Sequence, residues 1–197
     1  MNFNRKEEIL DAFIKLASIN GIDKTTMKDI AEEVGISVGL IYVDYKNKEE
    51  LIDAFEERMD HQFIASANEI LSRQLTINEK LYQLLVGVVE SFSLRIRKNR
   101  GVYEFASLDF IKYIKKKIKG KEIKSRELLV NWIETLMKQG VAEGIFAIED
   151  TVRTAELFVN AFHKYFGPPV VDQEHEELLK EAKDMANLLI KAITRSV

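Results

Sequence analysis

Apolar residues recur with a helical period along most of the chain. Near its start they lie three and four positions apart, at Ile9, Phe13, Leu16 and Ala17. This spacing predicts an amphipathic helix that turns one face toward a core. The 197 residues include only nine glycines and two prolines, so little interrupts such runs. The pattern therefore predicts an all-α fold built from long helices.

Two short helices joined by a tight turn are predicted over residues 26–44. Thr26 is a suitable N-cap for the first helix, with Asp29 in its first turn. Gly35 ends that helix, and Ser37 caps the second. Two helices joined by a glycine-containing turn form a helix-turn-helix, the unit that lays its second helix in the major groove of DNA.

Longer helices are predicted over the rest of the chain. Thr76 with Glu79 has the spacing of a capping box, as does Asn47 with Glu50. Glycines and the adjacent prolines mark the breaks between the apolar runs. The expected ranges are 48–72, 76–98, 102–119, 122–143, 149–166 and 173–195, which make nine helices with the three N-terminal segments.

A set of residues between Arg5 and Leu51 occurs in a characteristic order and spacing. Its members are Ile9, Ala12, Gly21, Thr25, Thr26, Ile30, Ala31, Val34, Gly35, Ile36, Ser37, Gly39, Ile41, Tyr42, Lys48, Glu49 and Leu51. This stretch resembles the DNA-binding domain of the tetracycline-repressor family of bacterial and archaeal regulators. The resemblance implies a nine-helix fold, with a helix-turn-helix domain over residues 1–48 and an effector-binding and dimerisation domain over residues 49–197. It also implies a cytoplasmic, homodimeric transcriptional regulator.

The resemblance assigns contacts with a double-stranded DNA operator to Thr26, Ser37, Val38, Gly39, Leu40, Tyr42, Lys46 and Lys48. In this assignment the two capping hydroxyls, the Tyr42 phenol and the Lys48 ammonium contact phosphates. Gly39 has no side chain, so the helix can approach the groove closely. Val38 and Leu40 occupy base-facing positions. Being apolar, they can touch thymine methyl groups but cannot form bidentate hydrogen bonds.

Asp44 departs from the family's pattern, because a carboxylate there would repel a DNA phosphate. We expect it to pair with Lys46 or Lys48, or to point away from the interface. Residues 1–48 contain seven basic and eight acidic residues, a net charge of −1. Either the acidic side chains face solvent away from DNA, or the chain has lost DNA binding. We favour the first reading, because affinity depends on the local potential.

Aromatic residues of the middle and late helices could line a pocket for a small hydrophobic effector. The candidates are Phe92, Tyr103, Phe105, Phe110, Tyr113, Trp132, Phe162 and His163. Each of them alone fits the core or the surface as well. The effector-binding assignment therefore depends on the group rather than on one member.

Broad apolar stripes mark the last two predicted helices. They are wider than one partner helix would cover, so they favour a four-helix interface between two copies of the chain. The alternative is burial within a monomer. The interface candidates are Phe158, Phe162, Phe166, Met185, Leu189 and Ile193.

Residues 95–126 form a basic stretch, with twelve Lys and Arg against three acidic residues, in a chain whose formal net charge is −3. A solvated helix face is the favoured reading, because isoleucines turn the other side of this segment inward. An anionic effector or an additional contact with the DNA backbone are the alternatives.

Several classes of function are excluded or disfavoured. The chain has no cysteine, which excludes disulfides and thiolate metal sites. No apolar run reaches the ~20 residues of a membrane span. The three histidines lie far apart, and no nucleophile or phosphate-loop motif occurs, so we expect no enzyme and no cofactor. The preferred interpretation is a repressor released from DNA by its effector. The alternative is a helical carrier or sensor of hydrophobic molecules with a vestigial DNA-binding domain.

Overall fold

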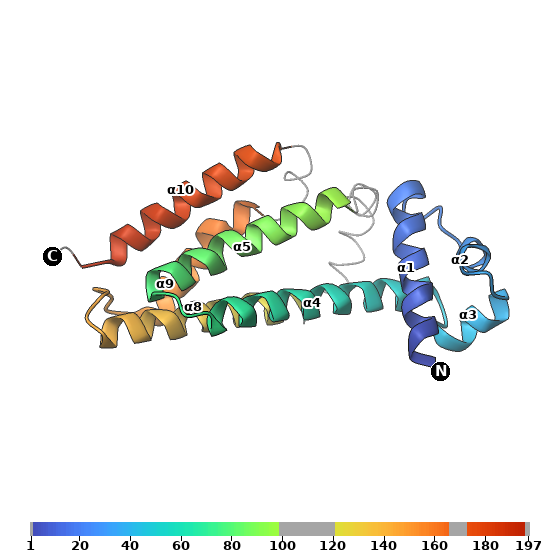
Figure 1. The fold of residues 1–197 in the computed structure, drawn as a ribbon, viewed down its shortest axis with the longest axis horizontal. Coiled ribbons are helices and arrows are strands. Elements are labelled where there is room, and N and C mark those ends of the chain that lie inside the picture. The colour runs from blue at the N-terminus through green and yellow to red at the C-terminus, as the bar shows by residue number, and fades with distance from the viewer. Residues whose placement is uncertain (1, 99–120, 166–172, 196–197) are drawn as a thin grey trace. The chain divides into compact units, whose positions relative to one another are not determined.

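A computed structural model of the chain describes residues 2–98, 121–165 and 173–195, and every regular element in these ranges is a helix (Figure 1). This confirms the expected all-α fold. The helix expected over residues 102–119, and with it the count of nine, lies outside the described residues. In chain order the elements are α1 (Asn2–Asn20), α2 (Met27–Val34), α3 (Val38–Asp44), α4 (Lys48–Ser72), α5 (Ile77–Lys98), α8 (Lys121–Ala142), α9 (Thr151–Phe162), the 3-10 helix η2 (His163–Tyr165) and α10 (His175–Ile193).

The described residues divide into two compact units. The first contains residues 2–62 with 95–98, and the second contains 63–94, 121–165 and 173–195. In the first unit, α1, α2, α3 and the start of α4 enclose one apolar core. The core includes the predicted inward face of α1, and its largest fully buried side chains are those of Ile9, Leu10, Phe13, Ile30, Ile41 and Leu51.

Local capping determines where the short helices begin and end. The Thr26 hydroxyl accepts a hydrogen bond from the Asp29 amide at 3.2 Å, and the Asp29 carboxylate accepts one from the Thr26 amide at 2.8 Å. Gly35 ends α2 in the left-handed conformation, with φ of 75°, as a C-cap glycine does. The Ser37 hydroxyl accepts from the Leu40 amide at 3.3 Å and opens α3. These contacts confirm the predicted helix-turn-helix.

The helices of the second unit begin and end close to their predicted limits. The segment expected over 149–166 starts instead at Thr151, because the Asp150 carboxylate caps α9 by accepting from the Arg153 amide at 2.9 Å. Its last turn, residues 163–165, is a 3-10 helix. None of the described helices combines the length and the apolar composition that a membrane span requires.

A close approach fixes the end of α8. A Cβ atom at Gly140 would lie 2.1 Å from Cδ2 of the buried Phe146 ring, so only glycine fits there. The residues that follow pair with the end of α10. Ala147 N donates to Ile193 O at 2.8 Å, and Arg195 N donates to Ile145 O at 2.9 Å. The connection after α8 is thereby tied to the end of α10.

Candidate nucleic-acid interface

The short helix α3 has one anchored face and one free face. Ile41 is fully buried in the core, and Val38 packs partly against it. Gly39 and Val43 lie four residues apart, so they share the side of the helix opposite Ile41. Val43 is 71% exposed, and Leu40 and Tyr42 beside it are 40% and 50% exposed. The free face of α3 therefore consists of an apolar surface around a glycine.

Gly39 is not required by packing within the protein. A Cβ atom at this position would meet only the Ser37 hydroxyl oxygen, at 3.9 Å. Its backbone is not in the left-handed region either, unlike that of Gly35. The glycine leaves the surface of α3 open at the centre of its free face, which favours close approach of another molecule.

Arg5 neutralises Asp44, which ends α3. Arg5 Nε lies 2.5 Å from Asp44 Oδ2, and the Asp44 side chain is only 4% exposed. The hydrogen bond from Arg5 holds the pKa of Asp44 below its ordinary value, and the same contact raises the pKa of Arg5. Of the two arrangements expected for Asp44, the pairing with Lys46 or Lys48 is wrong, because the partner comes from α1, 39 positions earlier in the chain.

Lys48 makes three hydrogen bonds inside the first unit. Its ammonium donates to the carbonyl oxygens of Ile22, Asp23 and Thr25 at 2.8, 3.1 and 3.1 Å. An ammonium group has three donors, so this arrangement uses all of them. Lys48 thus closes the connection between α1 and α2. Lys46 is exposed.

The capping hydroxyls of Thr26 and Ser37 differ in whether their hydrogen is already donated within the protein. The Thr26 hydroxyl donates to the Asp29 carboxylate at 2.7 Å as well as accepting from the Asp29 amide. The Ser37 hydroxyl accepts from Leu40, and no acceptor for its own hydrogen is found among the described residues. Ser37 therefore keeps a donor that Thr26 has already used.

Arg58 fixes α4 to α1. Its guanidinium lies 2.5 Å from Asp11 Oδ1 and also pairs with Glu7. The pKa of Arg58 is raised by these two carboxylates despite its partial burial. Together with Lys48, Arg58 holds the first turns of α4 against the helices before it. The sequence analysis missed this contact, because Arg58 and Asp11 are 47 positions apart.

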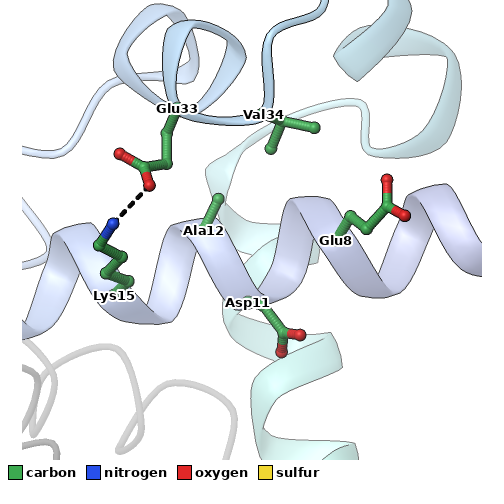
Figure 2. A pocket seen from close by; sticks show the side chains of 6 residues that line it. All are labelled: Glu8, Asp11, Ala12, Lys15, Glu33 and Val34. Atoms are coloured by element: carbon green, nitrogen blue, oxygen red, sulfur yellow. Dashed lines mark hydrogen bonds and ion pairs between the residues drawn. The ribbon is translucent and has the colours of Figure 1, made fainter.

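A hollow of about 350 Å³ opens between α1 and α2 (Figure 2). Lys15 and Glu33 point toward one another across it, with Lys15 Nζ 2.6 Å from Glu33 Oε1. Its lining carries three carboxylates, of which Glu33 pairs with Lys15 and Asp11 pairs with Arg58. The residues that line it are Glu8, Asp11, Ala12, Lys15, Glu33 and Val34. The hollow thus gathers three of the acidic side chains of α1 and α2.

The predicted effector-binding residues occupy different environments. Trp132 packs against Phe63 with ring centroids 5.7 Å apart, and Phe92 is half-buried. Phe162 is buried against the edge of Tyr165, whereas His163 is exposed. The remaining candidates lie outside the described residues, namely Tyr103, Phe105, Phe110 and Tyr113. Most of the basic stretch lies there too.

Several predicted interface residues are covered within a single chain. Phe158, Phe162 and Ile193 are buried, and Met185 and Leu189 are half-buried. Phe166 lies outside the described residues. The large apolar residues that stay exposed on the same helices include Val152 and Leu157 of α9, at 49% and 50%, and Leu188 of α10, at 64%. Leu157 belongs to the broad apolar stripe from which the interface was predicted. Leu188 was not predicted, although it lies opposite the buried stripe of its helix.

Residues 9–55 match the family described as "Bacterial regulatory proteins, tetR family". This match identifies residues 9–55 as a helix-turn-helix domain of that family's type. The chain is 37% identical over 75 residues to the fatty acid metabolism regulator protein of Bacillus subtilis. That alignment covers 38% of each chain, and another covers 47% of the B. subtilis HTH-type regulator YhgD, so the chain aligns with less than half of either relative.

Longer matches cover nearly the whole chain at lower identity. The HTH-type transcriptional repressor KstR2 of Mycolicibacterium smegmatis is 23% identical over 190 residues, which cover 89% of this chain and 87% of KstR2. A transcriptional regulator from Cytophaga hutchinsonii has a crystal structure with a TM-score of 0.76 at 21% identity, covering 98% of this chain and 100% of that one. The ketosteroid transcriptional regulator KstR2 of Mycobacterium tuberculosis has a TM-score of 0.59 at 20% identity, covering 100% and 98%. These structures share the fold of this chain.

Proposed function

We propose that this chain is a TetR-family regulator that binds a double-stranded DNA operator as a homodimer, as a repressor that a small hydrophobic effector releases. The free face of α3 carries the proposal. Gly39 and Val43 are exposed there while Ile41 anchors the opposite side in the core. A recognition helix needs this arrangement, because one side must be held by its domain and the other must enter the major groove.

The groups left for DNA phosphates are Ser37, Tyr42 and Lys46. Tyr42 is half exposed, Lys46 is exposed, and Ser37 retains a hydroxyl hydrogen to donate. Such contacts would set the register of the helix on the duplex without reading its sequence. Thr26 and Lys48, by contrast, already use their donors within the protein.

Two copies of the chain are needed to read two half-sites. Recognition helices of a dimer enter successive major grooves when they are one DNA turn, ~34–36 Å, apart. We assign the interface to the outward faces of α9 and α10, where Leu157 and Leu188 are exposed. Large exposed apolar side chains on neighbouring elements favour contact with another protein surface.

Release by an effector would act through α4. The first turns of this helix are fixed to α1 by Arg58 and to the preceding connection by Lys48. A molecule that displaces α4 from within the second unit would therefore carry the helix-turn-helix with it and change the half-site spacing. Relatives named for fatty acid metabolism and for ketosteroid support a hydrophobic effector.

Selection of the full chain on a pool of randomised duplexes tests the proposal. The wild-type protein should enrich one duplex sequence with two half-sites. If no duplex is preferred, the proposal fails and the chain is better read as a carrier or sensor of hydrophobic molecules.

A pair of glycine variants then tests the role of α3. Gly39→Ala has room for its Cβ in the free protein, so helix propensity should raise stability by up to about 1 kcal/mol. Its methyl group would stand between α3 and the groove, so affinity for the selected duplex should fall. Gly87→Ala in α5 is the matched control. Its Cβ would meet Ile70 Cδ1 at an ordinary 3.5 Å, and it should leave DNA affinity unchanged. Equal DNA affinity for both variants would contradict the role assigned to α3.

A further inference from the structure

We propose that α3 reads its half-site through the methyl groups of thymines, with Leu40 and Val43 as the residues that determine specificity. This inference rests on the proposed DNA binding and names the bases that the helix would recognise. It departs from the sequence analysis, which assigned the base-facing positions to Val38 and Leu40.

The two polar side chains of α3 cannot form bidentate hydrogen bonds with a base. Asp44 is paired with Arg5 and almost fully covered, so it offers no free acceptor to a cytosine or adenine amino group. Tyr42 has a single hydroxyl and cannot form a bidentate pair with a base. Every other side chain of the helix, from Val38 to Val43, is apolar or absent. Within α3 no side chain can make the paired hydrogen bonds that identify guanine or adenine.

The exposed positions of the helix define which side chains would lie deepest in the groove. Val43 is the most exposed of the large apolar residues of α3, and it shares its side of the helix with Gly39. Leu40 is adjacent to that side and is 40% exposed. Val38 turns partly toward the core. Because Gly39 has no side chain, the helix backbone can come near enough for a short valine to touch a base edge.

Among the four bases, thymine is the one whose major-groove edge gains most from contact with an apolar side chain. In the major groove its C5-methyl group is the apolar feature that distinguishes it, whereas guanine, adenine and cytosine present hydrogen-bonding groups. A leucine or valine placed against those groups would displace water and leave them unpaired, at a cost. Against a thymine methyl group, the same side chain buries apolar surface from both partners. The positions facing Leu40 and Val43 should therefore be occupied by thymine.

Base analogues in the duplex enriched from the randomised pool test this inference. Deoxyuridine keeps every hydrogen-bonding group of thymidine and lacks only the methyl group. We expect replacement at one or two thymines in each half-site to weaken binding by roughly three- to four-fold per methyl group, the effect of burying one such group. Cytosine at the same positions should bind poorly, and 5-methylcytosine should recover part of the loss.

Protein variants identify the residues that make the contact. Leu40→Ala and Val43→Ala remove exposed side chains, so the fold should persist, and each should lose the preference for thymine over uracil at one position. Tyr42→Phe is the matched comparison. It should weaken binding to the thymine and uracil duplexes equally, because a phosphate contact carries no base preference.

Two outcomes would overturn the inference, and they differ in their consequences. If a duplex is preferred but deoxyuridine substitution has no effect at any position, thymine recognition is wrong while the proposed DNA binding stands. If no duplex is preferred at all, the inference and the proposed function fail together.

Discussion

Arg5 Nε lies 2.5 Å from Asp44 Oδ2, and this ion pair joins the first turns of α1 to the last residue of α3. The guanidinium compensates the one carboxylate that α3 carries, so the helix can approach a polyanion without an unpaired negative charge of its own. The acidic hollow between α1 and α2 involves other carboxylates, those of Glu8, Asp11 and Glu33. The net charge of −1 over residues 1–48 therefore says little about the face proposed to meet DNA.

Replacing Arg5 should weaken DNA binding, because the charge of Asp44 would no longer be compensated. Arg5→Gln leaves Asp44 unpaired, and a unit charge about 4 Å from another in water costs about 1 kcal/mol. DNA affinity should fall about five-fold at low salt, as measured by fluorescence anisotropy with the selected duplex. The double variant Arg5→Gln/Asp44→Asn should bind almost as well as the wild type. If the double variant stays weak, Arg5 itself contacts DNA and the compensation argument is wrong.

The capping boxes should make the fold sensitive to acid. The Thr26 amide and hydroxyl hold the pKa of Asp29 below its ordinary 3.8, and the Thr76 hydroxyl and amide hold the pKa of Glu79 below its ordinary 4.5. Since both pKa values are lower in the folded state, this stabilisation is complete above the unfolded values and disappears as pH falls through the folded ones. The thermal midpoint should decline below about pH 4.5.

Substitutions at the two boxes provide the control for this pH dependence. Asp29→Asn and Glu79→Gln should lower the midpoint near neutral pH and make its decline in acid shallower. The measurement is thermal unfolding followed by circular dichroism from neutral to acidic pH. A decline that is unchanged in both variants would assign the acid sensitivity to other carboxylates.

Local contacts explain which features could be predicted from the sequence. The caps at Thr26 and Ser37 join residues three apart, and Gly35 needs only its own backbone, so these features follow from spacing. The bonds of Arg5 and Lys48 cross 39 and 26 positions and depend on how the helices pack. The exposure of Val43 could have been found, because the helical period places it opposite Ile41.

The two lysines near the start of α4 should behave differently. Lys48→Met removes three hydrogen bonds from one charged donor, so the free energy of unfolding should fall by about 1–3 kcal/mol even without DNA. Lys46→Met, at an exposed position, should change stability by no more than about 0.5 kcal/mol. It should instead lower the slope of log affinity against log salt by roughly 0.9. Urea unfolding and salt titrations distinguish the roles, and a stable Lys48→Met with a reduced salt slope would restore the phosphate assignment.

The last prediction separates the core of the second unit from its proposed dimer interface. Phe162 is 1% exposed and packs on Tyr165, so Phe162→Glu should bury an unpaired charge and unfold the unit. Leu157 and Leu188 are 50% and 64% exposed in the single chain, so a glutamate at either position stays in contact with water. The double variant Leu157→Glu/Leu188→Glu should therefore keep its helical circular dichroism and sediment as a monomer.

Leu94→Glu is the matched control, because Leu94 is a comparably exposed leucine on α5, at 51%. It should leave the sedimentation coefficient of the dimer unchanged at micromolar concentration. The monomeric double variant should also lose most of its affinity for the selected duplex, because each half-site would then be bound independently rather than at the high effective concentration that a linked partner provides. A wild-type chain that sediments as a monomer would exclude the dimer, and tight binding of the monomeric variant would exclude the need for two half-sites.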